Sequence, residues 1–305
     1  MIELLSEEKI TSPDYLRIKY DFYELWTKLF VNRSEIDRAL FRRFGRLWPL
    51  GRLMSETVAF AKGMLPRTII PWFIPQLAGI PLCADVILYS NQLWMPRCWE
   101  YPWAILNSAI SPESRILDVG SGWGLFPLYL AQRSNHIDSV DTNELQMKVL
   151  APVLADILQV RVNYLVGDAL DLPAADNTYD YVYCISVLEH LEEEKENGVV
   201  INRHTSKLER AAIREFIRVI RPGGRIILTL DYADTHSSPR SFGFAYVKDL
   251  IAEFSGNLLK PLDNIDEIEL TEAKERELRK LWAEYFPYDA TRAPAAALGI
   301  ILTKA

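Results

Sequence analysis

Residues 116–124 read Ile-Leu-Asp-Val-Gly-Ser-Gly-Trp-Gly, and this stretch predicts the fold of the chain. A short strand that ends at Val119 runs directly into a glycine-rich loop, and a helical stretch follows at 126–132. This order lets the backbone approach a nucleotide-like ligand, because glycine has no Cβ to block the turn or the ligand. The candidate binding residues of the loop are Gly120, Ser121, Gly122 and Gly124.

The sequence beyond residue 110 alternates short apolar runs with amphipathic helical stretches, which is typical of an α/β fold with a parallel sheet. The predicted strands are 115–119, 136–141, 162–166, 179–185, 225–230 and 296–303. The predicted helices are 126–132, 144–158, 206–220, 244–254 and 271–285. Pro222, Gly223 and Gly224 predict a sharp turn between a helix and the strand that follows it.

The chain is expected to divide near residue 110. Residues 1–110 are rich in aromatic residues and prolines, and we expect them to be helical, whereas residues 111–305 form the nucleotide-binding core. Within the first part, residues 68–82 are apolar but include three prolines. They therefore fit a buried or substrate-facing irregular segment better than a membrane-spanning helix.

Charge limits the partners of the chain. The formal net charge of −7 disfavours general binding to nucleic acid, whose phosphates attract basic proteins. A basic amphipathic helix is nevertheless predicted at 35–54, where Arg38, Arg42 and Arg46 share one face. A solvated face is the favoured interpretation, and peripheral contact with a membrane or with an anionic substrate is the alternative.

The cysteines indicate the compartment. The chain has three cysteines, with no spacing typical of a disulfide framework or a zinc site. The first residues also lack the basic and apolar regions of a signal peptide. We therefore expect a cytoplasmic location and no bound metal.

Acidic residues lie at the ends of three predicted strands. Asp118 would disfavour a pyrophosphate beside the glycine loop, but it suits a ligand with cationic groups. Asp141 follows Gly120 by 21 residues (141 − 120), where a carboxylate can accept hydrogen bonds from ribose hydroxyls. Asp168 follows the third strand, where it can accept from the amino group of an adenine. Each acid could instead cap the helix that follows it.

Five stretches, in this order and spacing, resemble the class I S-adenosylmethionine-dependent methyltransferases, most of all the type found in ubiquinone and menaquinone biosynthesis. They are LDVGSGWG (117–124), SVDTN (139–143), VGDALDLP (166–173), YDYVYCISVLEHL (179–191) and RVIRPGGRIILTL (218–230). The resemblance implies a Rossmann-like fold with a mostly parallel seven-stranded sheet, flanking helices and an N-terminal helical lid. It also implies S-adenosylmethionine as cofactor and S-adenosylhomocysteine as product.

The resemblance assigns roles to the candidate residues. The glycine loop would surround the methionine part of the cofactor, and Asp118 would hold its amino group. Asp141 would bind the ribose. The segment 185–188, which includes Ser186, would pass the sulfonium. The residues around the adenine would be Thr142, Asp168, Ala169 and Leu170.

Few residues are needed for the chemistry, because methyl transfer is an in-line displacement that chiefly requires positioning and, for a hydroxyl, removal of a proton. The candidate bases are His190 and His236, and Tyr232 could orient a substrate. The alternatives are a structural histidine at His190 and an ordinary polar loop at 231–236. No magnesium site is predicted, because Ser186 stands where a related metal-binding version of the motif has a glutamate.

The expected acceptor is a small hydrophobic or aromatic metabolite, with O- or C-methylation favoured. Seven of the eight tryptophans lie at or before Trp123, which would suit an aromatic-lined lid, although core packing is the alternative. Nucleic-acid base methylation is disfavoured, because residues 184–187 lack an Asn/Asp-Pro-Pro-aromatic motif. A nicotinamide-dependent oxidoreductase would need glycine at Leu125. A non-catalytic cofactor-binding scaffold is the third hypothesis, and the intact acidic residues speak against it.

Overall fold

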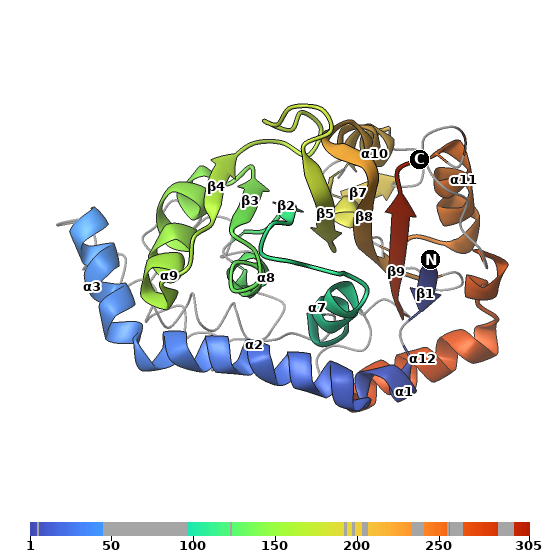
Figure 1. The fold of residues 1–305 in the computed structure, drawn as a ribbon. Helices are drawn as coiled ribbons and strands as arrows, with labels where there is room; N and C mark the ends of the chain where they lie inside the picture. Colours follow the sequence, from blue (N-terminus) through green and yellow to red (C-terminus); the bar gives the residue numbers. More distant parts are fainter. Residues whose placement is uncertain are drawn as a thin grey trace.

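The computed structural model describes residues 1–4, 6–44, 97–122, 124–191, 194–196, 199–202, 207–233, 241–254, 256, 265–285 and 296–305. In this part of the chain a seven-stranded sheet forms the centre, in the order β1-β9-β8-β5-β2-β3-β4 (Figure 1). Its strands are β1 (Ile2–Leu4), β2 (Arg115–Val119), β3 (His136–Asp141), β4 (Asn163–Val166), β5 (Tyr179–Ile185), β8 (Ile220–Tyr232) and β9 (Ala296–Thr303). A separate antiparallel pair consists of β6 (Glu194–Glu196) and β7 (Val199–Asn202).

The strand directions agree with the predicted fold class. The neighbouring strands β8, β5, β2, β3 and β4 run parallel to one another. Strand β9 is antiparallel to β8, and β1 is antiparallel to β9. The mostly parallel seven-stranded sheet is therefore confirmed. The edge strand β1 was not predicted, because three residues are too few for a periodic pattern.

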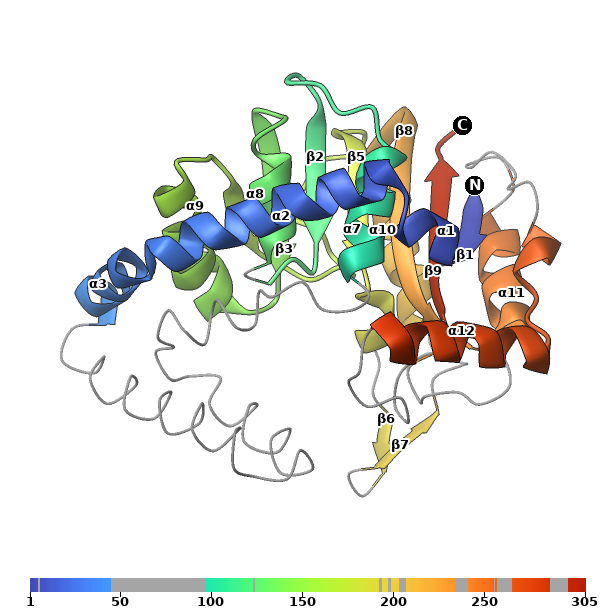
Figure 2. The ribbon, with the colours of Figure 1, turned by 90° about the horizontal axis from the view of Figure 1, so that it is seen from below.

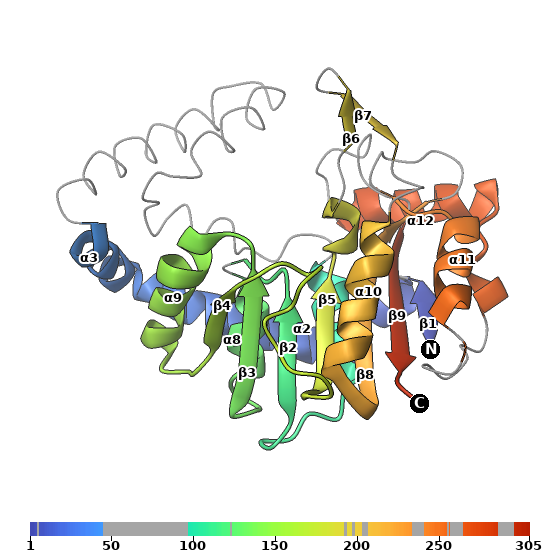
Figure 3. The ribbon, with the colours of Figure 1, turned by 90° about the horizontal axis from the view of Figure 1, so that it is seen from above.

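The central parallel strands β2 and β5 are buried on both faces. In β5, Val182 and Cys184 pack into one core, whereas Tyr181 and Tyr183 pack into the other. This double burial explains why β5 is rich in apolar and aromatic residues on both of its faces. Figures 2 and 3 show the two helical layers from opposite sides. One layer holds α7 (Arg97–Leu106), α8 (Leu125–Leu130) and α9 (Ala151–Leu158), and the other holds α10 (Leu208–Val219) and α11 (Phe244–Phe254). Helix α12 (Glu272–Tyr285) contacts β9.

Helix α2 (Pro13–Val31) lies across the outside of α7, α8 and α9, and α3 (Arg33–Phe44) continues from it (Figure 2). Ser12 caps the start of α2 by accepting a hydrogen bond from the N–H of Tyr15 at 3.5 Å. The buried stripe of α2 consists of Tyr15, Ile18, Phe22, Leu25 and Leu29. The ring of Phe22 stacks on Tyr129 of α8, with 4.2 Å between centroids. Helices α2 and α3 therefore pack on the outside of the layer that holds α7, α8 and α9.

Other expectations about residues 1–110 stay predictions. The apolar segment 68–82 and Arg46 lie outside the described residues, and neither the division at residue 110 nor the lid is tested. Arg38 and Arg42 are exposed on α3. None of the helices in the described ranges combines the length and the apolar composition needed to cross a bilayer.

Two features differ from the prediction. Residues 144–158 are helical as predicted, but Gln146–Leu150 form a π-helical turn before α9. The turn predicted at 222–224 lies inside β8 rather than before it. Tyr179 pairs with Ile220 and Tyr181 pairs with Arg225, so the intervening residues of β8 bulge out of the ladder.

Candidate functional site

The glycine loop joins β2 to α8 at the carboxyl end of the parallel strands. The N–H of Gly120 donates to the carbonyl of Val140 at 2.8 Å, which ties the loop to the neighbouring strand β3. Gly120 has φ of +74°, and a Cβ there would overlap the branched side chain of Val187. Gly122 also has positive φ, whereas Gly124 has φ of −67° and directly precedes α8. The loop therefore needs glycine most at Gly120.

Asp141 connects the glycine loop to the loop after β3. Its Oδ2 accepts from the N–H of Gly122 at 3.0 Å, and its Oδ1 accepts from the N–H of Asn143 at 2.8 Å. Each carboxylate oxygen keeps a second lone pair for another donor. Asp141 is only partly buried, so ribose hydroxyls are donors that this geometry accommodates.

The remaining predicted residues near the loop are polar and closely packed. The hydroxyls of Ser121 and Ser139 lie 2.5 Å apart. Asp118, on β2, is almost completely buried. Burial, together with the negative charge of Asp118, raises the pKa of Tyr164 on β4, so that phenol stays neutral. A second buried charge beside Asp118 is therefore avoided.

The loop after β4 brings Asp168 to the same end of the sheet. The N–H of Gly167 donates to the carbonyl of Asp141 at 3.1 Å. Asp168 is exposed, and its Oδ1 accepts from the N–H of Leu170 at 2.9 Å. Ala169 is buried and Leu170 partly buried, whereas Thr142 is exposed. The structure therefore places the residues expected around the adenine in two adjacent loops.

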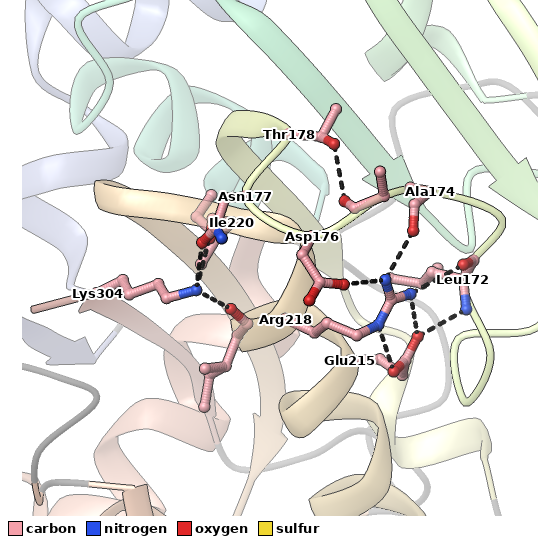
Figure 4. A network of polar contacts seen from close by, with 11 residues as sticks. Leu172, Ala174, Asp176, Asn177, Thr178, Glu215, Arg218, Ile220 and Lys304 are labelled. Atoms are coloured by element: carbon pink, nitrogen blue, oxygen red, sulfur yellow. Dashed lines mark hydrogen bonds and ion pairs between the residues drawn. The ribbon is translucent and has the colours of Figure 1, made fainter.

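A network centred on Arg218 of α10 holds the continuation of this second loop (Figure 4). The guanidinium donates to the carbonyls of Ala174 at 2.7 Å and Leu172 at 3.0 Å. It also contacts the carboxylates of Asp176 at 2.9 Å and Glu215 at 2.7 Å. Glu215 in turn accepts from the N–H of Leu172 at 2.9 Å. The hydrogen bond from Arg218 lowers the pKa of Glu215, although burial opposes this change.

The end of the loop is tied to the sheet as well. The N–H groups of Asn177 and Thr178 donate to the carbonyls of Arg218 and Val219 at 2.9 and 2.7 Å. The ammonium of Lys304, after β9, donates to Oδ1 of Asn177 at 2.8 Å (Figure 4). Contacts from two distant segments therefore fix the loop that carries Asp168.

Ser186 lies directly after β5, in the segment expected to pass the sulfonium. It has φ of +49° and is buried. Its hydroxyl donates to the carboxylate of Glu100, a fully buried residue of α7. Glu100 also accepts from the hydroxyl of Thr229, in β8, at 2.8 Å. Neither Glu100 nor Thr229 was among the predicted site residues. A signal for Glu100 was present in the sequence, because an acidic residue there stands between two aromatic residues, Trp99 and Tyr101.

The three candidate catalytic residues occupy different settings. His190 is exposed, in the 3-10 turn Leu188–His190 that follows β5. Tyr232 is fully buried, and its hydroxyl donates to the carbonyl of Ile268 at 2.9 Å. The expected role of Tyr232 in orienting a substrate stays a prediction. His236 lies outside the described residues.

Two further expectations concern tryptophans and metals. Trp99 and Trp103 of α7 are fully buried in the core and stack on each other, with 5.4 Å between centroids. Tyr101, between them, is only partly buried and lies beside Gly124. Within the described ranges, no three His, Cys, Asp or Glu side chains are grouped so that they could hold a metal.

Comparison with known proteins places this site in a family. Residues 117–228 match the family described as a methyltransferase domain. The chain is 33% identical over 117 residues to the ubiquinone/menaquinone biosynthesis C-methyltransferase of Dinoroseobacter shibae, covering 37% of this chain and 41% of that protein. It is 30% identical over 137 residues to the norajmaline N-methyltransferase of Rauvolfia serpentina, covering 44% and 41%. It is 29% identical over 116 residues to an O-methyltransferase of Aspergillus nomiae, covering 37% and 45%.

The chain thus spans less than half the length of these relatives. The matched residues include the glycine loop, Asp141, Asp168 and Ser186. The domain that spans residues 117–228 is therefore a class I S-adenosylmethionine-dependent methyltransferase domain, similar to that of the ubiquinone and menaquinone C-methyltransferases.

Proposed function

We propose that the chain transfers a methyl group from S-adenosylmethionine to a small hydrophobic or aromatic metabolite. The observation that carries this proposal is that Asp141 accepts hydrogen bonds from two backbone N–H groups and is still partly exposed. Its carboxylate fixes the positive-φ loop at Gly122 and keeps lone pairs for a ribose. A sugar carrying an adenine and a cationic sulfonium, without phosphates, fits a glycine loop with Asp118 buried beside it.

Each part of the site has a task in this reaction. Bound S-adenosylmethionine supplies an activated methyl group on a positively charged sulfur. The glycine loop would hold the methionine part, and Asp118 would attract its amino group. Asp141 would orient the ribose, and Asp168 would accept from the adenine amino group. These contacts fix the cofactor, so that the acceptor atom can approach in line with the methyl group.

A base is needed only if the acceptor loses a proton in the reaction. His190 stands at the carboxyl end of β5, and it is the described histidine that suits this role. His236 is the second candidate. If His190 is the base, His190→Gln will lower kcat for a hydroxyl acceptor by about 10²-fold or more and leave cofactor affinity unchanged. An unchanged kcat would assign His190 a structural role.

The class of acceptor atom is a proposal of its own. The relatives are named as C-, N- and O-methyltransferases, so the shared domain is compatible with all three. O- or C-methylation of a hydrophobic metabolite is our preference. The oxidoreductase alternative loses support, because the position of its third glycine holds Leu125, whose side chain is buried at the start of α8.

The test is calorimetric titration of the purified protein with S-adenosylhomocysteine, and with NAD as the competing ligand. We expect micromolar binding of S-adenosylhomocysteine by the wild type and none of NAD. Asp141→Ala should abolish binding, and Asp141→Asn, which keeps one oxygen acceptor, should weaken it. The matched control is Asp249→Asn, an exposed residue of α11.

The outcomes separate the three hypotheses. No binding of S-adenosylhomocysteine by well-folded wild-type protein would overturn the proposal, and binding of NAD would favour the oxidoreductase. Wild-type protein that binds should then be incubated with S-adenosylmethionine and a panel of phenolic and quinol acceptors. Formation of S-adenosylhomocysteine only when an acceptor is present would exclude a non-catalytic scaffold.

A further inference from the structure

A buried carboxylate links the N-terminal part of the chain to the strand ends beside the glycine loop. Glu100 of α7 is 0% exposed, and its Oε1 accepts hydrogen bonds from the hydroxyls of Ser186 and Thr229. Both donors are themselves buried, at the carboxyl ends of β5 and β8. Burying a carboxylate is costly unless it is hydrogen-bonded, so these two hydrogen bonds favour the observed position of α7.

The contact acts on a constrained backbone. Ser186 has φ of +49°, which side-chain-bearing residues adopt at a cost of about 1–2 kcal/mol. Its N–H donates to both the carbonyl and the hydroxyl of Thr229, at 3.1 Å each. The hydroxyl of Thr229 thus contacts the N–H of Ser186 as well as Glu100. Two side chains, Glu100 from α7 and Thr229 from β8, therefore hold this one residue in place.

The next residue carries the effect to the glycine loop. Val187 packs against Gly120 so closely that a Cβ on the glycine would overlap both methyl groups of the valine. The position of Ser186 therefore constrains the position of Val187, and the side chain of Val187 packs against Gly120. Glu100 acts on the glycine loop through this chain of contacts.

We propose that Glu100 is a positioning residue for cofactor binding, which acts through Ser186 and Val187 on the glycine loop. This inference rests on the proposed function, because the loop is taken to bind S-adenosylmethionine. It assigns to α7 a specific part in forming the site. It also predicts that the geometry of the carboxylate, as an acceptor for two hydroxyls, matters more than its charge.

The test compares Glu100→Ala with Glu100→Gln, which keeps an oxygen acceptor of the same shape. Glu100→Ala should weaken S-adenosylhomocysteine binding and raise the KM for S-adenosylmethionine by about tenfold, with a smaller change in kcat. Glu100→Gln should recover binding to within about threefold of the wild type. Glu113→Gln, an exposed glutamate before β2, is the matched control.

A second readout does not need the cofactor. Amide hydrogen exchange at residues 184–190 of the ligand-free protein should be faster in Glu100→Ala and near wild type in Glu100→Gln. Ser186→Ala should reproduce the weaker binding, and combined with Glu100→Ala it should add little, because the two residues act through one contact. This variant also covers the case in which Glu100→Ala fails to fold.

Three results would overturn the inference. Wild-type binding and exchange in Glu100→Ala would show that the contact is dispensable. Equal impairment of Glu100→Gln and Glu100→Ala, at equal thermal stability, would show that charge rather than geometry is required. Additive losses in the double variant would show that Ser186 and Glu100 act separately. If the wild type does not bind S-adenosylhomocysteine, the proposed function fails, and the exchange measurement alone still tests the positioning.

Discussion

Two acidic loops at the same end of the sheet are held in place in different ways. Asp141, after β3, is fixed from within the site, because both of its oxygens accept backbone N–H groups of adjacent loops. Asp168, after β4, is exposed and makes one such bond, to the N–H of Leu170 in its own loop. The rest of that loop depends on Arg218, which reaches it from α10.

The difference separates local from remote support. In the first loop the binding group and the supporting group are the same carboxylate, so a change there affects both functions. In the second loop the proposed binding group is Asp168, whereas the supporting group is Arg218 of α10. We therefore expect large effects from substitutions around Asp141, and smaller, graded effects from substitutions around Asp168.

The largest effect is expected from Gly120→Ala. The new Cβ would overlap Val187, and the positive φ adds a cost of about 1–2 kcal/mol. Binding of S-adenosylhomocysteine, measured by calorimetry, should fall by about 100-fold or more. The control is Gly223→Ala, whose φ is +78° but whose Cβ would meet no atom within 4 Å. Equal loss of binding in both variants would mean that alanine at any positive-φ glycine impairs binding, and would contradict a specific role for the packing of Gly120 on Val187.

The second effect concerns remote support. Arg218→Ala removes donors to two backbone carbonyls and two carboxylates, so the free energy of unfolding should fall by about 1–3 kcal/mol. The KM for S-adenosylmethionine should rise by about three- to tenfold, with kcat less affected. Urea unfolding and steady-state kinetics measure the two changes. Arg214→Ala, also on α10, removes an ion pair with Glu253 of α11 and should change neither appreciably.

The third effect depends on pH. The folded-state pKa of Glu215 lies below its ordinary value of 4.5, so its contribution to stability is present above that pH and is lost as the pH falls through the lowered pKa. Below pH 4.5 the loop should therefore loosen, with faster amide exchange at residues 171–178. Glu215→Gln should show no such pH dependence. An identical acid response in that variant would assign the change to other carboxylates.

The smallest effect is expected from Asp168→Asn. The amide oxygen can still accept from the N–H of Leu170, so the loop keeps its shape. Only the contact with the adenine amino group weakens, and affinity for S-adenosylhomocysteine should fall by about two- to fivefold. A loss as large as that of Asp141→Ala would contradict the contrast between the two loops.

The parts of the fold that were predicted are those with local patterns. The strands β2, β3 and β5 have the predicted bounds, because each is a short segment with β-branched or aromatic residues between turns. The family motifs likewise predicted the glycine loop, Asp141 and Asp168 from short stretches of sequence. Residues of this kind can be recognised from the residues next to them in the sequence.

The supporting residues could not be found in that way. Glu100 lies 86 residues from Ser186, and Arg218 lies 44 residues from Ala174. Their contacts depend on how α7 and α10 pack on the sheet, which no spacing in the sequence indicates. The role of Tyr232 stays a prediction: the sequence left open whether it orients a substrate or belongs to an ordinary polar loop, and in the structure its buried hydroxyl donates to the carbonyl of Ile268.

The position of β9 has a consequence for how the molecule is made. Strand β9 lies between β8 and β1, so Ile2 pairs with Ile300 on one side of a strand that meets β8 on the other. Along the chain β1 precedes, and β9 follows, the other strands of this sheet, so the ribosome synthesises them in that order. Until then, β1 has no partner and the edge of β8 stays open to pairing with other chains. This sheet can thus be completed only after β9 has been synthesised.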